Sequence, residues 1–535
     1  MIARKGFLIA STRIFVRFLG WIGLVVLAKM WGNFAPEAMG IIGFAMSFLA
    51  LFSIIGNLGF DKAHVKRVSE GKDLGRCIGT FITIKLLLTS LMIILIIGSI
   101  FVWTTFFNGG FTDATTVSVI FVFILYYVVF NISHIFTYTF EGKGEMAKRQ
   151  LSEIFEGIVK TPSTLLVVIA GVSIAGVSIP ALFEWPSILG ILQDFIARHP
   201  VGSLAMTYVF GAAGITIVGI LLMRSYPVKK PTKAYMHSYF VFALPMIITS
   251  VISVISTNID KITIGYFWDA TEVGYYFTVQ QVTLFIQLIS SSLSFVLFPT
   301  LSSYHSGNKI DLIKKTIRYA ERHISMILIP PVFFILVYSE SIIKIMLSAS
   351  FLPATSVMIV LAFFKLFSGL NVPYVALLSG INKPQLIAKN TFFVCTSNVI
   401  LNFIFVPKEG ILSSYGIQGA LGAAVATILS TFIGLIRLRY IAYKTIGFKG
   451  FPVFLIKHFI AGILMSISLF LINSYLLQGI IFRWYLLLLM SLLGLGIYLL
   501  ILYLIKEFTK EDFWFYLDVI NMKKMIKYIR GEIKR

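Results

Sequence analysis

The stretch GFLIASTRIFVRFLGWIGLVVLA, residues 6–28, is long enough to cross a membrane as one helix and carries two arginines in its interior. A spanning helix needs about 20 mostly apolar residues. A charged side chain near the bilayer centre costs about 2.5–3.5 kcal/mol on insertion scales, so Arg13 and Arg17 need a reason to be there. Their i,i+4 spacing puts both on one helix face. They either line a polar cavity or extend to the cytoplasmic surface.

The rest of the chain has the same character. Of its 535 residues, 58% are hydrophobic and only 13% are charged. Because a bilayer admits only helices or closed barrels, and these apolar runs have helix length, the sequence predicts an all-α polytopic membrane protein. About fourteen transmembrane helices are expected, at residues 6–28, 38–60, 77–106, 116–140, 154–177, 202–223, 236–258, 272–300, 323–343, 354–380, 387–406, 417–436, 452–477 and 484–505.

The basic residues predict the orientation of these spans. Most of the 45 Lys and Arg residues lie at the termini or in loops after even-numbered spans. The positive-inside rule therefore places both termini in the cytoplasm of a multi-pass protein of the inner or plasma membrane. This asymmetry also accounts for the net charge of +22, so no nucleic-acid partner is expected.

The segment SYPVKKPTK, residues 225–233, marks an internal boundary after the sixth span. Six spans on either side predict two lobes of equal orientation, and a weak echo between APEAMGIIGFA (35–45) and ATEVGYYFTV (270–279) supports a repeat. Parallel repeats place a substrate path at their shared interface. The expected parts are an N-lobe at 1–224, a linker at 225–235, a C-lobe at 236–440, two C-terminal helices at 441–506 and a basic amphipathic tail at 507–535.

Three segments have the pattern of surface helices rather than of spans. Residues 308–322 and 509–535 mix apolar and basic residues at helical spacing, and Thr509 with Asp512 predicts a helix start. The basic face of the tail suits an anionic inner leaflet, although a protein partner is an alternative. The outer loop 178–200 is long and apolar, and a short helix on the outer surface is expected there.

Further polar residues lie inside the predicted spans. Lys85 lies either in a cavity or near the surface, whereas Lys365 is close to the middle of its span. Gln280 and Gln287 lie on one polar face, which either packs against another helix or faces water. Asp260 is the one acidic candidate and is expected at the outer end of its span. With so few acidic residues, the interior is predicted to be cationic and to attract an anion.

Several motifs are absent from the sequence. It contains no GxxxxGK[ST] loop of an ATPase and no HExxH or CxxC spacing of a metal site, so no cofactor is expected. Either Na⁺ or H⁺ is a candidate coupling ion, because no motif selects between them. The outer loops contain no group of catalytic carboxylates, which argues against an enzyme that polymerises or ligates lipid-linked glycans.

Four stretches carry a family resemblance: LAKMWGNFAPEAMGIIGFA (27–45), TNIDKITIGYFWDATEVGYYF (257–277), LFPTLSSYHSGN (297–308) and NVILNFIFVPKEG with YGIQGALGAAVAT (398–427). In this order they resemble the polysaccharide flippases, or O-antigen translocases, of the multidrug/oligosaccharidyl-lipid/polysaccharide (MOP) exporter superfamily. The resemblance covers nearly the whole chain. It implies a MATE-like fold, in which two six-helix lobes, often with two extra helices, face a central cavity and work by alternating access.

The resemblance also implies the substrate, an oligosaccharide on a polyprenyl (pyro)phosphate carrier moved from the cytoplasmic to the outer leaflet. The expected cavity residues are then Arg13, Arg17, Lys85, Lys365, Gln280, Gln287 and Asp260. Membrane lipids are expected partners, and other polysaccharide-assembly proteins are a class of partner that the resemblance allows. A lipid II flippase and a cation-coupled multidrug exporter of the same fold are the alternatives. The exporter would be expected to carry buried carboxylates.

Overall fold

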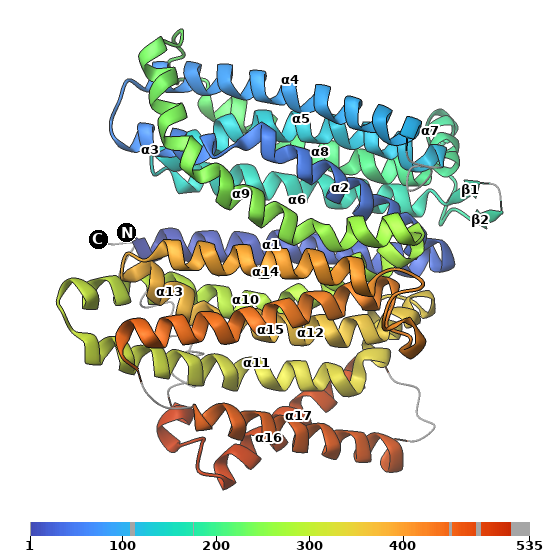
Figure 1. The fold of residues 1–535 in the computed structure, drawn as a ribbon. Helices are drawn as coiled ribbons and strands as arrows, with labels where there is room; N and C mark the ends of the chain where they lie inside the picture. The colour runs from blue at the N-terminus through green and yellow to red at the C-terminus, as the bar shows by residue number, and fades with distance from the viewer. Residues whose placement is uncertain (1, 107–112, 175, 449–451, 478–482, 515–535) are drawn as a thin grey trace. The chain divides into compact units, whose positions relative to one another are not determined.

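Nearly all of the chain is helical in the computed structural model, which describes residues 2–106, 113–174, 176–448, 452–477 and 483–514, apart from some side chains within helices (Figure 1). The long helices are α1 (Ile2–Met30), α2 (Ala35–Asn57), α4 (Leu74–Phe106), α5 (Ala114–Gly142), α6 (Met146–Ile169), α8 (Pro200–Met223), α9 (Lys233–Phe267), α10 (Ala270–Ser306), α11 (Ile310–Met346), α12 (Thr355–Leu370), α14 (Pro384–Phe405), α15 (Gly419–Ile446), α16 (Val453–Leu471) and α17 (Trp484–Leu504). The short ones are α3 (Phe60–Ser69), α7 (Ser187–Arg198) and α13 (Val372–Gly380), with single turns at Gly32–Phe34, Ala349–Ala354, Ser413–Tyr415 and Ile472–Leu476.

The predicted all-α membrane class is confirmed. Each of the predicted spans falls on a helix or on an adjoining pair of helices. Within the described part of the chain, ten helices are long and apolar enough to cross a membrane. The expectation of about fourteen spans therefore remains a prediction, although each of the fourteen predicted residue ranges is helical over most of its length.

Contacts along the chain define two compact units. One comprises Phe7–Thr278 and Asn402–Ala423, and the other Met1–Gly6, Val279–Leu401 and Ala424–Arg535. The first unit thus contains helix α9 in addition to α2–α8. The predicted division into an N-lobe, a linker and a C-lobe remains a prediction.

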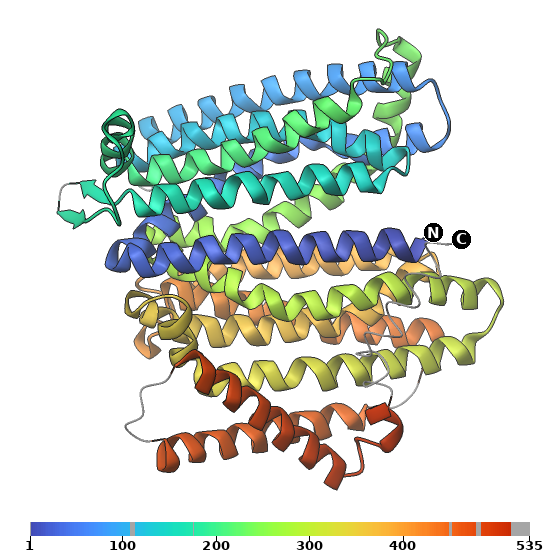
Figure 2. The ribbon, with the colours of Figure 1, turned by 180° about the vertical axis from the view of Figure 1, so that it is seen from behind.

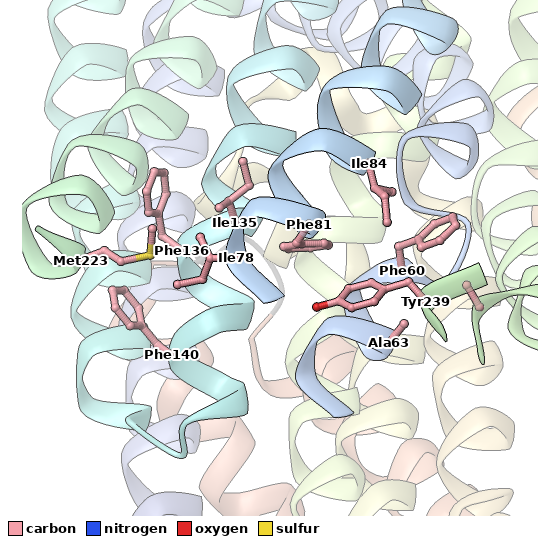
Figure 3. Packing of buried hydrophobic residues seen from close by; sticks show 11 residues of the cluster. Phe60, Ala63, Ile78, Phe81, Ile84, Ile135, Phe136, Phe140, Met223 and Tyr239 are labelled. Atoms are coloured by element: carbon pink, nitrogen blue, oxygen red, sulfur yellow. The ribbon is translucent and has the colours of Figure 1, made fainter. Parts of the chain in front are cut away.

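A sharp turn after α2 shapes the core of the first unit. Leu58 and Gly59 both have positive φ, 39° and 79°, and glycine adopts this conformation at little cost. The turn sends the short helix α3 back against α4, α5 and α9. Figure 3 shows the result: Phe60 of α3 and Phe81 of α4 pack with residues of α5 and with Tyr239 of α9. This turn also brings the polar residues of α3 into the protein interior.

The predicted outer loop between α6 and α8 is more ordered than the sequence indicated. A helix was expected and is confirmed as α7, but it follows a two-stranded antiparallel hairpin that was not anticipated, β1 (Val172–Ile174) with β2 (Val177–Ile179). The hairpin and α7 lie side by side at one end of the helices (Figure 2). Gly171, at φ 87°, makes the turn that ends the α6 region. Helix α6 therefore stops at Ile169, earlier than the predicted end at residue 177.

The second unit corrects one prediction and confirms another. Residues 308–322 do not form a separate surface helix, because α11 is continuous from Ile310 to a kink at Tyr338 and ends at Met346. Thr509 and Asp512 do form the predicted helix start: the Thr509 N–H donates to Asp512 at 2.9 Å, and the Asp512 N–H donates to the Thr509 hydroxyl at 3.2 Å. Arg322 of α11 forms ion pairs with Glu507 at 2.8 Å and Asp512 at 2.7 Å. The tail beyond residue 514 lies outside the described residues.

A small ion cluster joins the connection between α5 and α6 to the end of α8. Lys143 and Lys148 each place Nζ 2.8 Å from the carboxylate of Glu145, and the Tyr226 hydroxyl donates to it as well. Burial tends to raise the pKa of Glu145, but these three hydrogen bonds outweigh it and hold the pKa at about 2. The carboxylate is therefore charged across the physiological range.

Glu145→Gln is expected to lower the Tm of the solubilised protein by a few degrees at pH 7. The pKa of Glu145 is depressed on folding, so its contribution to stability is complete above its ordinary pKa of 4.5 and is lost as the pH falls toward about 2. The difference in Tm from the wild type should shrink over that window. Glu340→Gln is the control, because Glu340 is exposed and pairs only locally with Lys344, and such pairs contribute little. A Tm difference that does not change with pH would contradict the prediction.

Candidate functional site

The two arginines of the first span lie on one uninterrupted helix. Helix α1 includes Arg13 and Arg17 well inside its bounds, so their i,i+4 spacing does place them on the same face. Arg17 is exposed on the side of α1, and the side chain of Arg13 lies outside the described part. An arginine exposed on a long apolar helix places a positive charge that suits an anionic ligand.

Lys85 of α4 lies in a buried polar cluster. Its ammonium is 2.7 Å from a carboxylate oxygen of Asp61, and it donates to the Asn57 side chain at 2.5 Å and to the Gly56 carbonyl at 3.1 Å. The other oxygen of Asp61 is 3.1 Å from Nδ1 of His134, on α5. The Lys85 side chain is only 1% exposed. In this conformation its charge is balanced by Asp61 rather than offered to a ligand.

Asp61 and His134 were not among the residues predicted from the sequence. Few acidic residues were expected in the membrane interior, whereas Asp61 is 6% exposed and packed against the spans by the turn at Leu58 and Gly59. No local spacing joins Asp61 to Lys85, because they lie on different helices. The one available signal was the position of an aspartate directly after a long apolar run.

Asp260 lies in a second buried polar cluster of the same unit. Its two carboxylate oxygens accept hydrogen bonds from the Tyr276 hydroxyl at 2.6 Å and from the Asn402 side chain at 2.8 Å. Helix α9 continues to Phe267, so Asp260 lies about two turns before the helix end, and its location at the outer end of the span stays a prediction. Asp260 is 3% exposed, so it is an interior carboxylate with two polar partners.

The second unit brings together two of the predicted residues. The Lys365 ammonium of α12 donates to the Gln287 side-chain carbonyl of α10 at 3.1 Å. Gln287 and Gln280 are half-buried on α10, and Lys365 is 5% exposed. The predicted site residues thus occupy four places: the face of α1, the Lys85 cluster, the Asp260 cluster and the polar face of α10 with Lys365.

The two segments of the weak internal repeat meet within the first unit. A Cβ atom on Gly40 of α2 would lie 1.6 Å from the Ala270 carbonyl oxygen, and a Cβ on Gly274 of α10 would lie 1.8 Å from the Pro36 oxygen. Only glycine permits this approach, since real Cβ atoms do not come so close to backbone. The contact is reciprocal, as expected for equivalent segments of a repeat.

Comparisons with known proteins agree with this architecture. The model of a family described as "Polysaccharide biosynthesis protein" matches residues 2–305. The probable low-salt glycan biosynthesis flippase Agl15 of Haloferax volcanii is 25% identical over 429 residues, which are 80% of this chain and 81% of that protein.

Two solved structures share the fold. The lipid II flippase MurJ in an inward closed conformation has a TM-score of 0.65 at 19% identity, covering 96% of this chain and all of that one. An inward-facing MATE multidrug resistance transporter of the MOP superfamily has a TM-score of 0.62 at 12% identity. This match covers 81% of this chain and 98% of that chain. At such identities these likenesses show the fold alone, and the MATE-like fold expected from the sequence is confirmed.

Proposed function

Because the chain belongs to the polysaccharide biosynthesis protein family of MOP-superfamily transporters, we propose that it moves a polyprenyl-(pyro)phosphate-linked oligosaccharide from the cytoplasmic to the outer leaflet. The protein is a multi-span membrane transporter rather than an enzyme. The family match carries the proposal. The similarity of four-fifths of the chain to a probable glycan biosynthesis flippase supports it.

The exposed face of α1 suits the phosphate part of this substrate. A planar guanidinium can bind two phosphate oxygens at once, and Arg17 is accessible on the same face that carries Arg13. An inside-negative membrane potential favours outward movement of an anion by about 2.3 kcal/mol per charge per 100 mV. Polyprenyl phosphates are therefore a charge-compatible cargo for this helix.

The polar face of α10 suits the sugars. Gln280 and Gln287 carry amides that donate and accept hydrogen bonds, as sugar hydroxyls require, and Lys365 already donates to Gln287. A glycan hydroxyl could take the place of one of these partners without leaving a buried polar group unsatisfied.

The test is flipping of a fluorescent polyprenyl-pyrophosphate oligosaccharide in proteoliposomes. Arg13→Ala/Arg17→Ala is expected to lower the rate by ~100-fold or more, because each hydrogen bond to a charged group contributes about 1.5–3 kcal/mol. Lys29→Ala, which removes an exposed cation from the same helix, is the control and should leave the rate near that of wild type. A Na⁺ or H⁺ gradient across the same vesicles tests whether either ion drives transport.

The outcomes separate the parts of the proposal. Flipping by wild type that survives the double substitution would show that the arginines only reach the membrane surface. If the wild type does not flip this lipid but flips lipid II, the carrier-linked substrate class is right and the glycan is wrong.

A cation-coupled multidrug exporter is the second candidate, and one observation favours it. Such a transporter needs buried carboxylates, and Asp61 and Asp260 are buried in the described part of the chain. Both, however, are already held by basic or polar partners. Accumulation of organic cations in the same vesicles, without flipping of the lipid-linked glycan, would favour this candidate over the flippase.

A further inference from the structure

Helix α7 and the loop residues 183–186 before it cover a groove at the ends of α6 and α8. The groove has a volume of about 550 Å³, within the ~300–1,000 Å³ typical of ligand pockets. Its walls are Leu166 and Val167 of α6, Leu192 and Ile196 of α7, and Met206 and Phe210 of α8. These three helices belong to one unit, so the groove is a property of the first unit alone.

The groove offers little to a polar ligand. The hydroxyls of Ser163 and Thr207, which also line it, donate to the carbonyls of Val159 at 2.8 Å and Leu204 at 2.7 Å in their own helices. The buried indole N–H of Trp185 is an exception, because it has no hydrogen-bond partner among the described residues. Ser203 adds one more hydroxyl to a lining dominated by apolar side chains, so the walls suit a hydrocarbon chain.

The groove is continuous with the surface that faces lipid. Leu166 and Phe210, on its walls, are 50% and 48% exposed along α6 and α8, and α8 is apolar enough to span a membrane. A lipid chain next to these helices can thus enter the groove without crossing water. Tryptophan is typical of the membrane–water interface, where Trp185 would lie if this end of α6 and α8 is at the membrane surface.

The cover over the groove is fixed in place and has an apolar outer face. The Gln193 side chain accepts from the backbone N–H of Trp185 at 2.9 Å and donates to the Phe183 carbonyl at 3.1 Å, which joins the loop to α7. On α7, Ile191 is 81% exposed and does not line the groove, whereas Phe195 lines the groove and is still 58% exposed. An apolar helix with exposed large side chains is stable when it lies in the interface of a bilayer. Its charged residues, Asp194 and Arg198, balance, so it has no electrostatic preference for anionic headgroups.

From these features we propose that α7, the loop residues 183–186 before it and the adjoining ends of α6 and α8 form a binding site for one hydrocarbon chain of a bilayer lipid. The lipid belongs to the leaflet in which α7 lies, the outer one by the predicted orientation. Helix α7 rests in the interface and closes the groove over the chain. The proposal is independent of the transported substrate.

The test uses the full-length protein in liposomes that contain a phosphatidylcholine with a mid-chain photoreactive diazirine. After illumination, labelled peptides are identified by mass spectrometry. Wild type is expected to carry label in residues 163–167, 183–196 and 203–210. Leu192→Trp, which fills the groove, should lower this labelling several-fold. Ile191→Trp adds the same ring to the exposed face of α7 and should leave it unchanged.

Labelling of α17 serves as the internal reference for lipid contact in every variant. If Leu192→Trp does not fold, Met206→Trp fills the groove from the opposite wall. Equal labelling in wild type and in groove-filled variants would overturn the proposal, as would the absence of label from these segments. Loss of the label on adding a small fraction of unlabelled polyprenyl phosphate would also overturn it, because the occupant would then be the isoprenoid chain of a carrier.

Discussion

A disulfide between Gly43→Cys and Phe277→Cys is expected to stop transport completely when it is oxidised and to restore it when it is reduced. A Cβ atom on Gly43 would lie 3.0 Å from the Cβ of Phe277, close to the ~3.5–4.5 Å of a disulfide. The bond would tie α2 to α10 beside the contact of Gly40 with Gly274. In alternating access, equivalent segments that touch at one end of a transporter must separate when that end opens.

The chain suits this experiment because Cys77 and Cys395, its two cysteines, are buried and form no disulfide, and both can be replaced by serine. Flipping is measured in proteoliposomes before and after oxidation, and again after dithiothreitol. The matched control is Gly43→Ala/Phe277→Ala, which makes the same change in packing without thiols and should respond to neither reagent. Flipping at the wild-type rate by fully cross-linked protein would mean that this contact stays closed throughout transport.

The close approach of α2 and α10 shows what the sequence could and could not predict. The similarity between residues 35–45 and 270–279 indicated a repeat, because related segments leave related patterns of glycine and apolar residues. It could not show that the two segments touch. A glycine can occur within a helix for many reasons. Only the positions of the Ala270 and Pro36 oxygens explain why residues 40 and 274 are glycines.

Local patterns were reliable, and long-range pairs were not. The i,i+4 spacing of Arg13 and Arg17 and the Thr509–Asp512 helix start are set by helix geometry within one turn, so the sequence alone predicted both. The hairpin at residues 172–179 was missed because its short apolar strands look like the end of a span, and the positive φ of Gly171 decides where α6 stops. The partners of Lys85 and Asp260 come from helices far along the chain, so no spacing reveals them.

Replacing only one member of the Asp61–Lys85 pair is expected to destabilise the protein strongly. Asp61→Leu leaves the Lys85 ammonium buried without its carboxylate, and removing one partner of a buried ion pair costs about 3–5 kcal/mol. The same change removes the acceptor of His134, at a further cost of about 1–3 kcal/mol for an unsatisfied buried group. Thermal unfolding of the purified protein in detergent should therefore show a large fall in Tm, or a loss of folded protein.

The double substitution Asp61→Leu/Lys85→Met separates a structural role from a role in transport. Replacing a buried ion pair by apolar residues of similar size is often neutral or stabilising, so the double variant should regain most of the lost Tm. If the pair only holds α3 against α4, flipping should return together with stability. If Lys85 exchanges Asp61 for a substrate phosphate during transport, the variant should be stable but inactive, since methionine provides no charge for the anion. A double variant no more stable than Asp61→Leu alone would show that the two side chains are not energetically coupled, and the ion pair would then explain neither the fold nor transport.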